Sequence, residues 1–128
     1  MAVIAPAIKD LSPFGDQSCM QVIWTPVTEN DSCGPVQYPK HSTKSIQVET
    51  SGVGNNSFGG CSVALKGSND GTNFEALSTP ANAAIAITAA GIKAVLENTV
   101  QIKPVATGGT NQSIAITMLL EFANPTRQ

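Results

Sequence analysis

The chain of 128 residues is long enough for one domain with its own core, which its 41% of hydrophobic residues can fill. Charged residues make up only 12% and the formal net charge is −2, so the clustered lysines and arginines of a nucleic-acid-binding surface are missing. The longest apolar run, near residues 83–90, falls far short of the roughly 20 residues of a membrane span, and the N-terminus lacks the basic and apolar regions of a signal peptide, so we expect neither a membrane nor an export pathway.

The first 20 residues show no clear helical or strand periodicity, and Pro6 and Pro13 interrupt what pattern exists. We predict an extended N-terminal arm over residues 1–20, with a frayed terminus as the simpler alternative. The arm is more apolar than a free tail requires, so we expect it to pack onto a neighbouring subunit. The apolar side chains that suggest this contact are Val3, Ile4, Ile8, Leu11 and Phe14.

Beyond the arm, short segments that alternate apolar and polar residues are separated by clusters of Gly, Pro and Asn. Within Lys44–Thr50, Ile46 and Val48 point inward, and in Gln112–Phe122 every second residue from Ile114 to Phe122 points the same way. Further strands are predicted over residues 21–27, 60–67, 73–78, 83–88 and 100–107, with a loop over residues 30–39 that can hold a short edge strand. This spacing of strands is typical of a β-sandwich or barrel.

One helix is predicted among the strands. Ile92, Val95 and Leu96 have helical spacing within Ala89–Asn98, and Thr88 can cap the N-terminus. We expect this short helix to cover one end of the sandwich. No linker divides the chain, so residues 21–124 form one β-sandwich domain and residues 125–128 a C-terminal tail.

The three cysteines, Cys19, Cys33 and Cys61, are widely spaced and form no C-x-x-C pair, so a structural zinc site has little support. In a reducing compartment we expect free thiols, with Cys61 as a small core residue. A Cys19–Cys33 disulfide is the alternative.

The sequence shows no pattern of residues that carries out catalysis. The only histidine, His41, lies in a polar loop between Lys40 and Ser42 and is predicted to be a solvated surface residue. Motifs for a nucleophile elbow, a phosphate loop or a zinc protease are missing, and no spacing forces two carboxylates into one cleft. We expect no enzymatic activity and no cofactor.

The most distinctive local feature is the polar turn Ser68–Asn73. Its clustered oxygens resemble a calcium ligand set, but the further acids and final Glu of an EF-hand loop are missing. The Asp70-Gly71 pair favours a tight hairpin turn, because Gly adopts positive φ without strain. We predict a hairpin rather than a metal site, and calcium-dependent thermal stability would contradict this.

Residues 63–74 resemble the strand–turn–strand segment of small structural proteins encoded among the head genes of tailed phages. The likeness continues in residues 24–27, 89–98, 102–105 and 107–110. Together these segments follow one another over about residues 21–120, and the N-terminal arm lies outside the similarity.

The resemblance implies a virion component of the capsid decoration (cement) protein type. On that basis we expect a jelly-roll-like β-sandwich that forms a homotrimer on the outer surface of the head and stabilises contacts between major capsid protein subunits. Such a protein is made in the host cytoplasm and ends in the virion. A surface of small uncharged polar groups suits these contacts, since few ions must lose their water. The apolar residues of the arm are the expected contact residues.

Two alternatives remain open. The first is a carbohydrate-binding or receptor-binding domain, for which the exposed aromatic residues are few: Trp24 and Phe74 lie in strand patterns that favour burial. Only Tyr38 and Phe58 lie in loops, and glycan binding that is lost in Tyr38→Ala would favour this alternative. The second is a tail-tube or neck protein.

Overall fold

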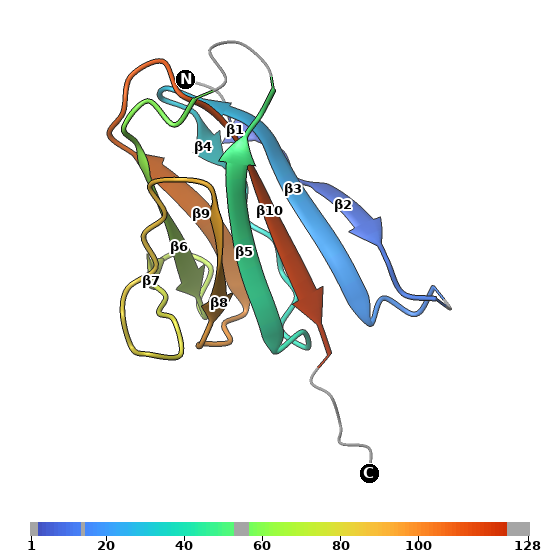
Figure 1. The fold of residues 1–128 in the computed structure, drawn as a ribbon. Coiled ribbons are helices and arrows are strands. Elements are labelled where there is room, and N and C mark those ends of the chain that lie inside the picture. Colours follow the sequence, from blue (N-terminus) through green and yellow to red (C-terminus); the bar gives the residue numbers. More distant parts are fainter. Residues whose placement is uncertain (1–2, 14, 53–56, 123–128) are drawn as a thin grey trace.

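The computed structural model describes residues 3–13, 15–52 and 57–122, and this part of the chain contains ten strands and no helix. Five strands form an antiparallel sheet in the order β2 (Ala7–Asp10), β3 (Cys19–Thr28), β10 (Ser113–Glu121), β5 (Thr43–Thr50) and β8 (Gly91–Val95). A second antiparallel sheet contains β7 (Glu75–Ala76), β6 (Ser62–Ser68) and β9 (Gln101–Thr107), and β1 (Val3–Ile4) pairs in parallel with β4 (Ser32–Cys33). The predicted all-β class is confirmed (Figure 1).

The central strand of the larger sheet is β10, which pairs with β3 on one side and β5 on the other. Its inward side chains, from Ile114 to Leu120, are fully buried, because alternate residues of a strand point to the same face. Phe122, which the alternation predicts to be inward as well, lies beyond the end of the strand and is 41% exposed.

Both larger sheets contribute to one hydrophobic core. Val22 and Trp24 come from β3, Val63 and Leu65 come from β6, and all four are fully buried in the same cluster. The indole Nε1 of Trp24 donates a hydrogen bond to the carbonyl oxygen of Gly34 at 2.9 Å, so the ring is buried without an unpaired donor.

The predicted helix over residues 89–98 is wrong. Residues 91–95 form strand β8, which pairs antiparallel with β5 and places Lys93 opposite Ile46. Val95 is buried, whereas Ile92 is 63% exposed and Leu96 47% exposed, so the three do not share a buried face. A helix of this length has little stability on its own. The edge of β5 offers backbone hydrogen-bonding groups to a further strand, and β-branched residues such as Ile92 and Val95 favour the strand conformation.

Two other predicted strands are shorter than expected. Residues 83–88 form only isolated bridges, Ser78 to Ala84 and Val63 to Ile87, although Ile85 and Ile87 are buried as the alternation predicts. In the segment 73–78 only β7 is a strand. Phe74, predicted to be buried, is half-buried, and the ammonium group of Lys103 lies 4.4 Å from its ring centroid.

The N-terminal region is more closely joined to the domain than its sequence suggests. β2 pairs antiparallel with β3, with Ile8 opposite Val22, and so forms one edge of the larger sheet (Figure 1). The backbone hydrogen bonds of an edge strand do not require apolar–polar alternation, which explains why the sequence pattern did not reveal it. The predicted C-terminal tail, residues 125–128, lies outside the described residues.

Candidate functional site

The outward side of the five-stranded sheet brings together side chains from several neighbouring strands. The register places Leu119 of β10 between Gln21 of β3 and Ser45 of β5, and it places Thr117 between Ile23 and Gln47. A shallow groove of about 230 Å³ runs over this side. Its lining residues, which we call the outer-face groove, are Gln21, Ser45, Gln47, Ile92, Thr117 and Leu119.

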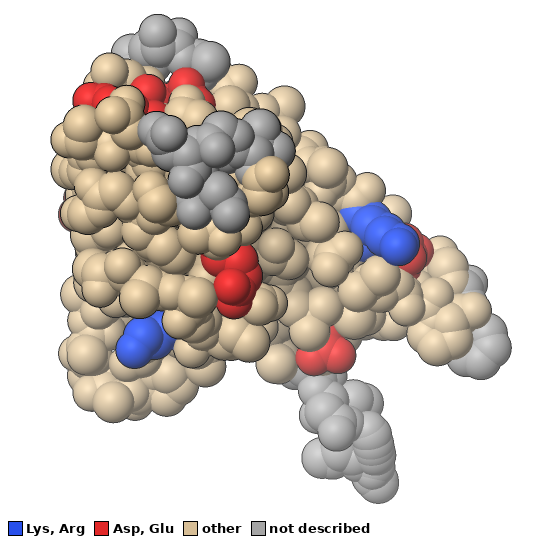
Figure 2. Space-filling model, turned by 45° about the horizontal axis from the view of Figure 1, so that its top comes forward, with Lys and Arg blue, Asp and Glu red and all other residues tan. Residues whose placement is uncertain are grey.

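None of the residues of the outer-face groove is charged. The charged residues of the outward side lie toward its margins: Lys9 on the edge strand β2, Glu49 near the end of β5 and Glu121 at the end of β10. Figure 2 shows a surface that is mostly uncharged, with charged side chains scattered singly or in small groups. Such a surface loses water at little free-energy cost when another protein covers it.

Three of the five arm residues predicted as contacts are exposed. Val3 is 71% exposed, Ile8 48% and Leu11 40%. Ile4 packs against the domain's own core, so its side chain is already covered within the chain, and Phe14 lies outside the described residues.

The opposite edge of the same sheet carries two exposed apolar residues that the sequence analysis assigned to a helix and did not predict as contact residues. Ile92 lies on strand β8 and Leu96 follows it, and both are about half exposed or more. The helix prediction led us to expect both residues on a buried face. Apolar and polar residues do not alternate clearly from Ile92 to Leu96. Only the pairing with β5, which places Ile92 opposite Gln47, shows that Ile92 belongs to the outward side.

The polar turn Ser68–Asn73 connects β6 to β7, which pair with each other as a hairpin. Asp70 Oδ1 accepts hydrogen bonds from the backbone N–H groups of Thr72 and Asn73, both at 2.8 Å, and Gly71 has a φ of +78°. The hydroxyl of Ser68 and the side-chain amide of Asn73 also donate to this carboxylate. The hydrogen bonds from Asn73 and Thr72 hold the pKa of Asp70 well below its usual range. The carboxylate therefore closes the turn, and the described residues contain no cluster of three or more His, Cys, Asp or Glu that could hold a metal ion.

The three cysteines are free thiols. Cys61 is fully buried in the core, as predicted, and burial raises the pKa of Cys33 to about 12. Thiols held in this protonated form are poor nucleophiles.

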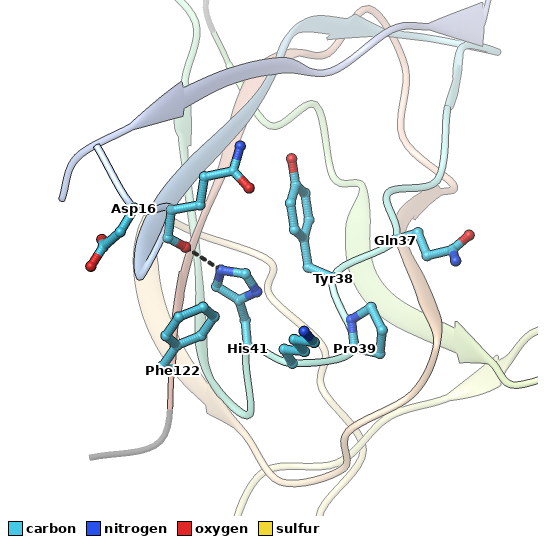
Figure 3. A pocket seen from close by; sticks show the side chains of 8 residues that line it. Asp16, Gln37, Tyr38, Pro39, His41 and Phe122 are labelled. Atoms are coloured by element: carbon cyan, nitrogen blue, oxygen red, sulfur yellow. Dashed lines mark hydrogen bonds between the residues drawn. The ribbon is translucent and has the colours of Figure 1, made fainter. Parts of the chain in front are cut away.

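His41 is not the solvated residue that its polar neighbours predict, because it is only 5% exposed. Its Nε2 lies 2.6 Å from the carbonyl oxygen of Gln17, and its ring lies between Tyr38, with centroids 5.1 Å apart, and Phe122, with centroids 4.7 Å apart (Figure 3). Nδ1 is buried and has no hydrogen-bond partner among the described residues. The prediction failed because Gln17 and Phe122 are distant in sequence, and the fold brings them to the histidine.

Beside His41, Lys44 is buried on the inward side of β5. Its ammonium group donates to the carbonyl oxygen of His41 at 2.9 Å and to Oδ1 of Asn98 at 2.5 Å, while the Asn98 amide donates to the carbonyl of Pro39. Burial lowers the pKa of Lys44. This network fixes the loop from Pro39 to His41 against the end of the larger sheet.

No family model matches the chain, and no curated protein shows a significant match to it. A membrane-spanning helix is not found in the part of the chain that the structure describes. Two surface features of the chain therefore bear on its function beside the sequence resemblance: the outward side of the sheet with its uncharged groove, and the loop end around His41.

Proposed function

We propose that this chain is a capsid decoration (cement) protein of a tailed phage, a jelly-roll-like β-sandwich that binds the outer surface of the head and stabilises contacts between major capsid protein subunits. The observation that carries the proposal is the outward side of the five-stranded sheet, whose groove contains no charged residue and whose β8 edge carries the exposed Ile92. The sequence resemblance supplies the class of protein, and this surface supplies a means of binding.

The exposed apolar side chains provide the favourable part of the binding energy. Ile92 lies on the outward side at the β8 edge, with Leu96 following it, and covering apolar surface is worth about 25 cal/mol per Å². At the other edge, Leu11 and Ile8 are also exposed, although Ile8 is opposite the buried Val22 and so lies on the inward side. Between the two edges, Gln47 and Thr117 offer hydrogen-bonding groups without charges that must be neutralised. A protein interface of ordinary size needs about 800 Å² on each partner.

Binding of this kind stabilises the shell without catalysis. A protein that contacts two neighbouring capsid subunits binds only the assembled state, so its binding energy adds to the stability of the assembly by mass action. We propose that the chain acts as a homotrimer at such a junction, in the virion, after synthesis in the host cytoplasm.

Quantitative mass spectrometry of purified particles tests the proposal. Decoration of the whole head requires hundreds of copies of the chain per particle, whereas a handful would indicate a tail, neck or vertex protein and overturn it. Co-sedimentation of the purified chain with undecorated heads then tests binding directly.

The expected contact residues near the N-terminus are best tested by substitution rather than by deletion of the segment. β2 is part of the larger sheet, and its deletion would expose the edge of β3. Ile8→Glu combined with Leu11→Glu removes exposed apolar surface at this edge. Unchanged binding to heads would exclude the β2 edge from the interface and leave the outer-face groove as the contact.

A further inference from the structure

A separate cleft of about 440 Å³ lies at the end of the larger sheet where β5 begins and β10 ends. Three segments that are distant in sequence form it: the loop before β3, the loop between β4 and β5, and the residue that follows β10. The residues that line this cleft, which we call the His41 cleft, are Asp16, Gln17, Gln37, Tyr38, Pro39, Lys40, His41 and Phe122. It shares no residue with the outer-face groove.

The middle of the cleft is aromatic. Tyr38 and Phe122 lie on opposite sides of His41, as Figure 3 shows, and Phe122 is 41% exposed. Tyr38 packs against the hydrophobic core, and the Lys44–Asn98–Pro39 hydrogen bonds hold its loop. The aromatic faces are therefore positioned before any ligand binds, which reduces the entropy that binding must overcome.

Polar groups lie at the two ends of the cleft. The carboxylate of Asp16 and the amide of Gln37 are on opposite sides of the aromatic residues in Figure 3, and Lys40 also lines the cleft. Hydrogen bonds from Ser18 hold the pKa of Asp16 below its ordinary value, so this group is an ionised acceptor at neutral pH. Gln37 accepts a hydrogen bond from Gln101 at its Oε1, and its side chain points away from the aromatic residues in Figure 3.

The charges of the cleft argue against an ionic ligand. Its lining holds one carboxylate, Asp16, and one ammonium group, Lys40, so the two charges cancel. A phosphate or sulfate needs a surplus of positive groups, and a metal ion needs more acidic or imidazole ligands than this end of the chain supplies. A neutral ligand with hydroxyl groups fits the arrangement better.

We propose that the His41 cleft binds a neutral sugar residue, with the apolar face of the ring against Tyr38 and Phe122 and a hydroxyl group on the carboxylate of Asp16. The cleft volume falls within the roughly 300–1,000 Å³ of small-molecule sites, and an aromatic middle with a few polar groups at its ends is the usual composition of such sites. This binding goes beyond the attachment to a shell, because it uses other residues and holds whether or not the chain is a decoration protein.

A glycan array probed with the full chain identifies candidate sugars. Calorimetric titration with the methyl glycosides of glucose, galactose, mannose and N-acetylglucosamine then distinguishes recognition of a single sugar from recognition of a longer glycan. We expect saturable binding of at least one neutral sugar, with one site per chain. Binding of only phosphorylated or carboxylated sugars, or of no sugar in either assay, would overturn the proposal.

Variants of the lining residues locate the site. Tyr38→Ala should weaken binding by roughly fivefold or more because it removes the aromatic face, and Asp16→Ala by roughly tenfold because it removes a charged acceptor. Phe58→Ala, which removes the other half-buried loop aromatic, is the matched control and should bind as the wild type does. If Tyr38→Ala does not fold, Phe122→Ala takes its place, since Phe122 lies beyond the end of β10 and is exposed. Full binding by both Asp16→Ala and Phe122→Ala would show that the sugar binds elsewhere.

Discussion

The outward side of the larger sheet and the His41 cleft are both exposed, but they differ in shape and chemistry. The first is a broad surface formed by regular alternation on four strands, and its groove contains no charged residue. The second is concave, is formed by three loop segments, and combines aromatic rings with a carboxylate and an ammonium group. A broad uncharged surface can be covered by another protein at low desolvation cost, whereas a concave site with fixed polar groups suits a small ligand.

The two regions also differ in how they are stabilised. Behind the outward side lies a continuous row of buried aliphatic residues on β10, so substitutions on the outward side should leave the fold intact. The cleft instead depends on buried polar groups, His41 and Lys44, whose hydrogen bonds to the neighbouring loops fix its shape. Substitutions there should affect stability and binding together.

The largest expected effect comes from adding charge to the outward side. The double variant Gln47→Arg with Thr117→Arg should reduce affinity for undecorated heads by at least about 100-fold, about 2.7 kcal/mol, because two unpaired charges would be buried in the interface. Urea unfolding should change by no more than about 1 kcal/mol, since both side chains are on the outward side and the main cost is the repulsion of like charges on opposite residues of β5 and β10. Adding the same charges elsewhere, as Thr72→Arg with Ala76→Arg near β7, is the control, and equal loss of binding there would remove the distinction between the surfaces.

His41→Ala should lower the free energy of unfolding by about 2 kcal/mol. The variant loses ring contacts and the hydrogen bond to Gln17, while the removal of the unpaired Nδ1 offsets part of this loss. Lys40→Ala, the exposed neighbour, should change stability by less than about 0.5 kcal/mol. Equal unfolding midpoints in urea for the two variants would mean that His41 does not stabilise the loop end.

Strand β8 extends the outward side to the sheet edge, and two substitutions test it against the helix that the sequence pattern predicts. Val95→Ala should cost about 1.5 kcal/mol because Val95 is buried, whereas Ile92→Ala should cost less than about 0.5 kcal/mol because Ile92 is 63% exposed. A helix with both residues on one buried face would make the two costs similar. Chemical denaturation of both variants distinguishes the two structures, and Ile92→Ala should also weaken binding to heads.

The smallest effect concerns the Asp70 turn, which belongs to neither region. The folded-state pKa of Asp70 lies below its ordinary value of 3.8, so the unfolded chain binds more protons as the pH falls through that value. The stability that Asp70 contributes is therefore present above about pH 4 and lost in more acidic solution. Thermal unfolding of the Asp70→Asn variant should depend less steeply on pH below 4 than that of the wild type, and parallel curves would contradict the role given to the carboxylate.

Adding calcium tests whether the same turn binds a metal ion. Because four hydrogen-bond donors already occupy the Asp70 carboxylate, millimolar calcium should leave the unfolding temperature of the wild type unchanged. An increase of several degrees in the unfolding temperature would indicate that the turn binds calcium.

The sequence by itself determined the all-β class, the inward residues of β5 and β10 and the hairpin around Asp70. These features depend on local rules, namely the two-residue repeat of a strand with one buried side and the positive φ that Gly71 adopts easily. Each can be found from a few consecutive residues, whatever the rest of the chain does.

Only the tertiary structure decided that residues 91–95 form an edge strand, that β2 joins the larger sheet and that His41 is buried. Each outcome depends on a partner far away in the chain: β5 for β8, β3 for β2, and Gln17 with Phe122 for His41. Local propensity distinguishes weakly between a short helix and an edge strand, so the free hydrogen-bonding edge of β5 decides between them. The outward side follows from alternation once the strands are paired, whereas the His41 cleft exists only because folding brings three separate loops together.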